Sequence, residues 1–274
     1  MNRLETKTIE HNGITTAYYD EGQGPVLLLL HGFTGSKLDF HDQLAWFSDS
    51  YRVVVPDIRG HGESTNTRDE ATYTLDTLVD DLESFINTLG LEGVHLLGHS
   101  MGGMVVLRYA LAHHGELASL MLMDTSSAPL TMREGMREIF KSAIEKQGVQ
   151  GLINLMRNAP MPREVKNGID FLGEDEHWHR IEEKLGQMDM IAYKALAMEL
   201  GMANDITASL ASISCPTTVL VGEADEAFVE PSRVMADMVP NGELHIISGA
   251  SHCPQYENAG QWKAVIEAHL SRSA

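Results

Sequence analysis

The fold of this chain is decided by one short stretch, which reads Val94-His95-Leu96-Leu97-Gly98-His99-Ser100-Met101-Gly102-Gly103. Its first four residues are largely apolar and predict a short buried strand, which Gly98 ends. After Gly103 the apolar residues recur at the spacing of one face of a helix. We therefore expect Ser100 at a sharp corner between a strand and a helix.

The glycines on either side of this corner have a mechanical reason. A serine in such a turn takes a strained backbone conformation, and side chains at Gly98 or Gly102 would collide across it. The helix that follows directs its unpaired N–H groups and positive dipole end at Ser100, where they would stabilise a developing negative charge. Gly-x-Ser-x-Gly is a short pattern, so its interpretation depends on the surrounding elements.

Composition narrows the class of protein. The 274 residues, 43% hydrophobic and 22% charged, suit one large α/β domain, with or without an insertion. The net charge of −19 argues against nucleic acid and anionic membrane surfaces as partners. The two cysteines cannot form a disulfide framework and the first residues lack an apolar export signal, so we expect a cytoplasmic protein. No apolar run near the N-terminus could cross a bilayer, and no membrane association is expected.

Strand-like and helix-like patterns alternate on both sides of the corner. Residues 7–20 predict a hairpin that turns at Asn12-Gly13. Further strands are predicted at residues 26–30, 51–55, 94–97, 120–123, 217–221 and 244–247. This alternation predicts an α/β fold with a mostly parallel sheet and helices on both faces. Ligands bind such sheets beyond the carboxyl ends of the strands, where His31, Ser100 and Asp124 all fall.

The alternation is interrupted once, after the sixth predicted strand. Between residues 127 and 209 strand signals vanish, and helical patterns appear around residues 132–146, 151–157, 178–188 and 191–202. We therefore expect a sheet-containing core of residues 1–126 and 210–274, with residues 127–209 as a helical insertion. Eight of the chain's 15 methionines lie in the insertion. They are expected mainly to form its own core, the alternative being an adaptable apolar roof over the site.

A nucleophilic serine needs a base and a group that orients the base. His252 is the candidate base, because it lies in the loop after the last predicted strand. Asp225 is the candidate orienting acid, in a Gly-x-x-Asp turn after the preceding strand. Asp124 competes with it, since it also follows a strand on the catalytic side. We favour Asp225 and expect the side chain of Asp124 to cap the backbone amides of Ser126 or Ser127.

The same chemistry needs N–H donors for an oxyanion. The candidates are the backbone N–H groups of Met101, directly after the serine, and of Phe33, in the glycine-bearing loop after residues 26–30. His31 is expected to shape that loop. Asp57, Arg59 and Ser64 are expected to brace another loop. His177 and His179 point to different faces of a helix, so no metal site is predicted there.

Five segments carry a family resemblance: His31–Gly35, Asp57–Ser64, Gly98–Gly103, Gly222–Asp225 and Gly249–His252. In these segments, and over everything except the insertion, the chain resembles the α/β-hydrolases. The resemblance implies a core sheet of about eight strands, a helical cap over the site, the chain order Ser100, Asp225, His252 for a catalytic triad, and no cofactor.

The nucleophile selects among the branches of this family. Haloalkane dehalogenases and epoxide hydrolases of this fold carry aspartate at the position of Ser100, which excludes both. The motif Gly-x-Ser-Met-Gly-Gly is similar to that of small carboxylesterases, lactone and enol-lactone hydrolases, and cofactor-free haloperoxidases. The resemblance therefore implies a serine hydrolase acting on a small-molecule ester or lactone.

Two alternatives stay open. Carbon–carbon hydrolases of ring-cleavage products often have asparagine before the serine, where this chain has His99. A ligand-sensing protein with slow turnover would need the same triad. The sequence also leaves a monomer and a homodimer equally open.

Overall fold

The computed structural model describes residues 4–113, 115–130, 134–158 and 163–273. These residues form an eight-stranded sheet in the order β1-β2-β4-β3-β5-β6-β7-β8. The strands are β1 (Lys7–His11), β2 (Ile14–Glu21), β3 (Val26–Leu30), β4 (Arg52–Pro56), β5 (Val94–His99), β6 (Leu117–Met123), β7 (Thr217–Gly222) and β8 (Gly242–Ile247). The β1–β2 and β2–β4 pairs are antiparallel, and every pair from β4 to β8 is parallel. The prediction of a mostly parallel sheet of about eight strands is confirmed.

Helices cover both faces of this sheet because alternate strand residues point to opposite sides. The core helices are α1 (Leu44–Phe47), α2 (Leu75–Leu89), α3 (Met101–Ala112), α8 (Glu226–Met238), α9 (Pro254–Glu257) and α10 (Ala259–Arg272). Leu28 and Leu30 of β3 share a buried cluster with residues of α2, α3 and α8. Leu27 and Leu29 share another with α1 and α10. The continuous apolar run of β3 thus serves two cores.

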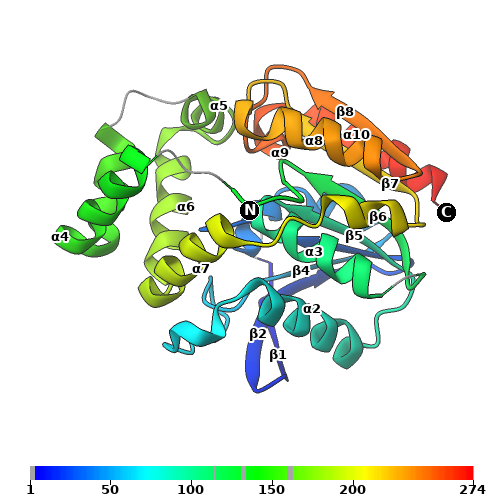
Figure 1. Cartoon of the computed structure of the whole chain (residues 1–274), viewed down its shortest axis with the longest axis horizontal. Helices are drawn as coiled ribbons and strands as arrows, with labels where there is room; N and C mark the ends of the chain where they lie inside the picture. Colours follow the sequence, from blue (N-terminus) through cyan, green and yellow to red (C-terminus); the bar gives the residue numbers. More distant parts are fainter. Residues whose placement is uncertain (1–3, 114, 131–133, 159–162, 274) are drawn as a thin grey trace.

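A helical insertion follows β6, as predicted. It contains α4 (Glu134–Asn158), α5 (Arg163–Leu172), α6 (Glu174–Gln187) and α7 (Met190–Met202), which group together at one end of the sheet in Figure 1. Its buried side chains, such as Leu185 and Leu196, belong to the same cluster as those of α2 and α3. The expectation that the insertion forms its own core is therefore wrong, because its apolar faces pack down onto the sheet-containing core.

Three helical boundaries differ from the sequence prediction. Helix α5 was not expected, because Pro160 and Pro162 precede it and Gly168 interrupts its short apolar pattern. Helix α4 runs across two predicted helices that meet at Gly148, which has a non-helical backbone (φ 59°). Helix α6 begins at Glu174, four residues before the predicted range 178–188. None of the described helices has the length and apolarity needed to cross a membrane.

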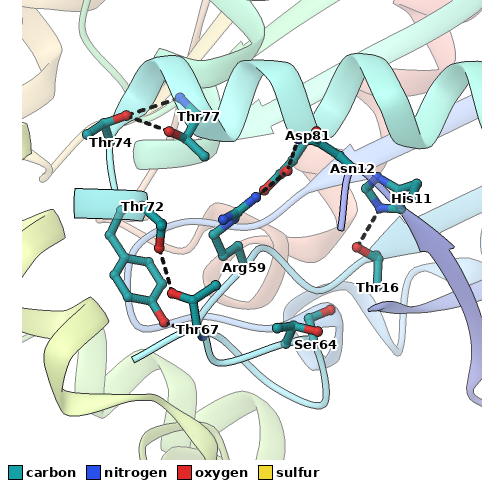
Figure 2. Close-up of polar contacts among 12 residues, drawn as sticks. His11, Asn12, Thr16, Arg59, Ser64, Thr67, Thr72, Thr74, Thr77 and Asp81 are labelled. Carbon is teal, nitrogen blue, oxygen red and sulfur yellow. Dashed lines mark hydrogen bonds and ion pairs between the residues drawn. The ribbon is translucent and has the colours of Figure 1, made fainter. Parts of the chain in front are cut away.

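The loop after β4 is braced from both sides, as Figure 2 shows for Arg59. The Arg59 guanidinium donates to both oxygens of Asp81 on α2, at 2.6 and 2.7 Å. Ser64 Oγ donates to the carbonyl of Asp57 and accepts from the N–H of Ala17. A charge-assisted fork of this kind fixes orientation as well as distance. These contacts confirm that Asp57, Arg59 and Ser64 brace the loop.

Candidate active site

Ser100 lies at the expected corner between β5 and α3. Its backbone has φ 53° and ψ −118°, a left-handed conformation that is uncommon for a residue with a side chain. Two hydrogen bonds hold it there. The N–H of Ser100 donates to the carbonyl of Met123 at 2.9 Å, and Thr125 Oγ1 donates to the carbonyl of Ser100 at 2.6 Å. Strain of this type persists only where the surroundings enforce it.

The motif glycines permit two different close approaches. A Cβ on Gly98 would lie 2.5 Å from the carbonyl oxygen of Gly102, so that glycine does face across the corner. A Cβ on Gly102 would instead run into the carbonyl oxygens of Leu30 and His31. Gly102 therefore lets α3 approach β3, which the sequence argument did not foresee.

That approach brings the loop after β3 against the serine. A Cβ on Gly32 would lie 2.9 Å from the Cβ of Ser100. A turn with Thr34 in the left-handed region (φ 61°), closed by the Gly35 N–H on the carbonyl of Gly32, shapes the loop that carries Phe33. Met101 begins α3, so its N–H has no helical acceptor one turn earlier. Both proposed oxyanion donors thus lie on segments that flank Ser100.

His252 and Asp225 come together although 27 residues separate them. His252 Nδ1 lies 2.7 Å from Asp225 Oδ2. The loops that carry them follow the neighbouring strands β7 and β8 and are joined by backbone hydrogen bonds, including Ala224 N–H to the Ala250 carbonyl at 2.8 Å. The ring of Phe228 stacks on that of His252 with centroids 5.0 Å apart. The imidazole is therefore held by the Asp225 carboxylate on one edge and by the Phe228 ring on one face.

The sequence argument named no partner for His99, which the structure places between the serine and the histidine loop. His99 Nε2 donates to the backbone carbonyl of His252 at 2.7 Å, and the two rings are 4.8 Å apart. Burial, followed by the charge of His252, lowers the pKa of His99 to about 3, so the ring is neutral. In the sequence, the one signal for this contact was that a histidine precedes Ser100. Its partner could not be identified there, because His252 lies 153 residues away.

Asp124 does not take the role expected of it. Its Oδ1 accepts from the N–H of Gly222 at 2.9 Å, and among the described residues no donor reaches its Oδ2. The side chain therefore turns toward β7 and does not cap the chain after β6. One carboxylate oxygen of Asp124, one of Asp225 and a ring nitrogen of His252 lie within 4.8 Å of one another, a set that could also hold a metal ion.

His31 supports the loop after β3, as expected. Its Nε2 accepts from the N–H of Ile58 at 2.9 Å, which leaves the proton on Nδ1 to be donated to the carbonyl of Gly32 at 2.8 Å. Burial lowers the pKa of His31 to about 4, despite the opposing charge of Asp39. A neutral ring with both nitrogens engaged has a structural role.

The insertion lies over these loops and is tied to them. The rings of Phe33 and Tyr193 of α7 lie 4.9 Å apart. Lys184 of α6 pairs with the buried Asp39 at 2.5 Å. Burial alone would raise the pKa of the Asp39 carboxyl, but Lys184 holds it below its usual range. An ion pair and a ring contact thus join the insertion to the loop and short helix that follow β3.

The fold matches that of known proteins. The model of the α/β hydrolase fold family matches residues 25–148. A non-heme chloroperoxidase from Kitasatospora aureofaciens is 30% identical, over 88% of this chain and 90% of that protein. The chain therefore belongs to the α/β-hydrolase fold family.

Solved structures agree with this assignment. A thermophilic esterase from Thermogutta terrifontis is 28% identical, with 98% of this chain and 99% of that chain covered and a TM-score of 0.76. The enol-lactonase from Burkholderia xenovorans has a TM-score of 0.83 with 97% and 100% covered. Its 22% identity shows the fold alone.

Proposed function

We propose that this protein is a serine hydrolase that cleaves a small-molecule carboxylic ester or lactone. One observation carries the proposal: His252 Nδ1 lies 2.7 Å from Asp225 Oδ2, and the backbone carbonyl of His252 is hydrogen-bonded to His99, the residue before the strained Ser100. Serine, acid and histidine follow strands in the order typical of hydrolases on this fold. The similarity to an esterase supports the substrate class.

Each residue has a separate task in the proposed reaction. His252 takes the proton of Ser100 Oγ, whose oxygen then attacks the carbonyl carbon. Asp225 keeps the proton on Nδ1 and stabilises the imidazolium. The N–H groups of Met101 and Phe33 stabilise the oxyanion. Collapse of the intermediate expels the alcohol, which takes the proton from His252, and leaves an acyl-enzyme. His252 then activates water, which releases the acid and restores Ser100.

The experiment measures turnover of an ester, lactone and vinylogous diketone panel by the wild-type chain and two serine variants. Ser100→Ala should lose nearly all activity, because the members of a triad act as a unit. Ser271→Ala, an exposed position on α10, is the matched control and should turn over at the wild-type rate. An organophosphorus probe should label Ser100, as located by mass spectrometry.

Retention of full esterase activity in Ser100→Ala would reject the proposal. Hydrolysis of the diketone alone would assign the protein to the carbon–carbon hydrolases. A total of only a few turnovers per molecule would favour a ligand sensor. Because Asp124, Asp225 and His252 could hold a metal ion, the rate is also measured after chelation. The serine mechanism predicts no change.

The 30% identity with a chloroperoxidase favours a second reaction, in which the acyl group is transferred to hydrogen peroxide. Hydrogen peroxide attacking the acyl-enzyme in place of water would release a peracid and free Ser100. The peracid would oxidise bromide to hypobromite and be reduced to the carboxylate. With acetate, hydrogen peroxide, bromide and a dye that hypobromite brominates, the wild type should brominate the dye and Ser100→Ala should not. Halogenation that persists in Ser100→Ala would exclude this route.

A further inference from the structure

We propose that Asp124 is a neutral carboxylic acid that donates its proton to Asp225 and so positions the carboxylate facing His252. The inference deepens the proposed function and rests on its triad. Asp124 is a positioning residue, because it acts through Asp225.

The backbone aims Asp124 at the acid loop. Directly after β6 it has φ 44°, in the left-handed region, where aspartate and asparagine are the side chains best tolerated. The N–H of Asp124 donates to the carbonyl of Leu220 on the neighbouring strand, at 3.0 Å. Its Oδ1 accepts from Gly222, three residues before Asp225. The carboxyl is therefore fixed against the end of β7.

The carboxyl of Asp124 receives too few hydrogen bonds for an anion. The side chain is fully buried, and among the described residues no donor reaches Oδ2. An ionised carboxylate with one bare buried oxygen is costly, since it loses water without a replacement. A protonated Oδ2 becomes a donor instead, and the neighbouring Asp225 offers an acceptor. One added proton thus gives Asp124 Oδ2 a hydrogen-bond partner and gives the Asp225 carboxylate a donor.

The charges around Asp124 favour the same state. The titratable groups around it are Asp225 from the loop after β7, Glu257 of α9, and His252, whose ring nitrogen lies within 4.8 Å of a carboxylate oxygen of Asp124. Two carboxyl groups so close together cannot both ionise without cost. Burial, followed by the charge of Asp225, holds the pKa of Asp124 well above its usual range.

The proton belongs on Asp124 and not on Asp225. Asp225 already accepts from His252 Nδ1 at 2.7 Å, which stabilises its anion. Within the described part of the chain, Asp124 accepts only from the neutral N–H of Gly222. The resulting chain runs from the Asp124 hydroxyl to the Asp225 carboxylate to the His252 ring, so the acid is oriented from both ends.

The direct test is infrared difference spectroscopy of the full chain at pH 7, wild type minus Asp124→Asn. The C=O stretch of a protonated carboxylic acid should appear in the wild type and vanish in the variant. In Asp225→Asn the neighbouring charge is gone, so the band should titrate at lower pH. Absence of the band at pH 7, or its survival in Asp124→Asn, would overturn the proposal. If the variants do not fold, a pH titration of the wild type labelled with ¹³C in its aspartate carboxyls tests the same protonation by NMR.

The activity test uses three variants with folding checked by circular dichroism. Asparagine keeps a donor and an acceptor at position 124, so Asp124→Asn should stay within about tenfold of wild-type kcat, well short of the 10⁴-fold loss typical for an orienting aspartate. Asp124→Ala removes both groups and should lose about 100-fold. Asp225→Asn should lose up to about 10⁴-fold. A larger loss in Asp124→Asn than in Asp225→Asn would make Asp124 the catalytic acid and reject the proposal.

The two proposals can fail separately. The infrared band requires no turnover, so a band without esterase activity would sustain the shared proton and reject the hydrolase. Ser100-dependent turnover without the band would sustain the hydrolase and reject the protonated Asp124.

Discussion

The histidines around Ser100 have different roles because their ring nitrogens have different partners. His252 engages Asp225 through Nδ1, which leaves Nε2 as the nitrogen that would take the serine proton. His31 engages both of its nitrogens in backbone hydrogen bonds. His99 uses Nε2 to hold the His252 carbonyl. One side-chain type thus serves as candidate base, loop support and tether within a small volume.

The hydrogen bond from His99 to the His252 carbonyl leads to a prediction at the residue scale. His99→Leu removes the donor to the His252 carbonyl and should lower kcat by about tenfold to 100-fold, with little change in KM, because the base shifts relative to Ser100. His99→Gln should recover most of kcat, since its amide nitrogen can reach the position of Nε2. Steady-state kinetics of both variants, with thermal unfolding as a check, decides the matter. Wild-type kcat in His99→Leu would show that the contact is structural only.

At the scale of elements, the site is made by close approach of α3, β3 and the loops after β7 and β8. Gly102 lets α3 reach β3, and Gly222 lies where a Cβ would meet the carbonyl of Ser251 in the histidine loop. Glycine is required here for space, since neither position has a positive φ. The elements can be at their working distance only if these positions carry no side chain.

Gly102→Ala should therefore destabilise the protein and displace Ser100 from the loop after β3. The overpacking should cost about 1–3 kcal/mol of unfolding free energy, and kcat should fall, up to about 100-fold. Gly186→Ala is the matched control on α6, where nothing lies within 4 Å of an added Cβ. It should stabilise the protein by about 0.5–1 kcal/mol, because alanine is the better helix former. Equal effects of the two substitutions, measured by urea unfolding, would contradict this account.

At the scale of the whole molecule, burial keeps several histidines neutral. It lowers the pKa of His31 and His269 to about 4 and that of His61 and His99 to about 3. Each folded pKa lies below the unfolded value near 6.5. Above pH 6.5 neither state binds the proton, so these groups do not affect stability. Below it the unfolded state binds protons first, and stability falls until the folded rings titrate. The carboxyls of Asp57 and Asp124, whose folded pKa values are raised mainly by burial, oppose this trend.

The unfolding free energy should consequently drop between pH 6.5 and 4. Each buried histidine contributes a slope of up to about 1.4 kcal/mol per pH unit. His269→Leu, on α10 and away from the site, should remove one such slope even if it also destabilises the protein at pH 7. Ser271→Ala, which removes no titratable group from an exposed position of α10, should leave the slope unchanged. Denaturant unfolding at pH 7, 6 and 5 measures all three slopes. The same slope in His269→Leu as in the wild type would refute this explanation.

The sequence by itself determined the sheet, the corner at Ser100 and the insertion after β6. These features are encoded locally, in strand and helix periodicity and in glycines that a turn requires. It also singled out Ser100, Asp225 and His252 as candidates, because parallel strands bring their carboxyl ends to one edge. Their catalytic roles stay a prediction that the Ser100 and Asp225 variants test.

Only the tertiary structure decided which polar groups meet. His99 and the carbonyl of His252 are 153 residues apart, and Asp124 contacts Gly222 across 98 residues. The packing of the insertion onto the sheet-containing core also joins residues that are distant in the sequence. Such contacts depend on strand order and on the distance between packed elements, which no local pattern records. Local periodicity therefore specified the elements, and long-range packing specified how their side chains are combined.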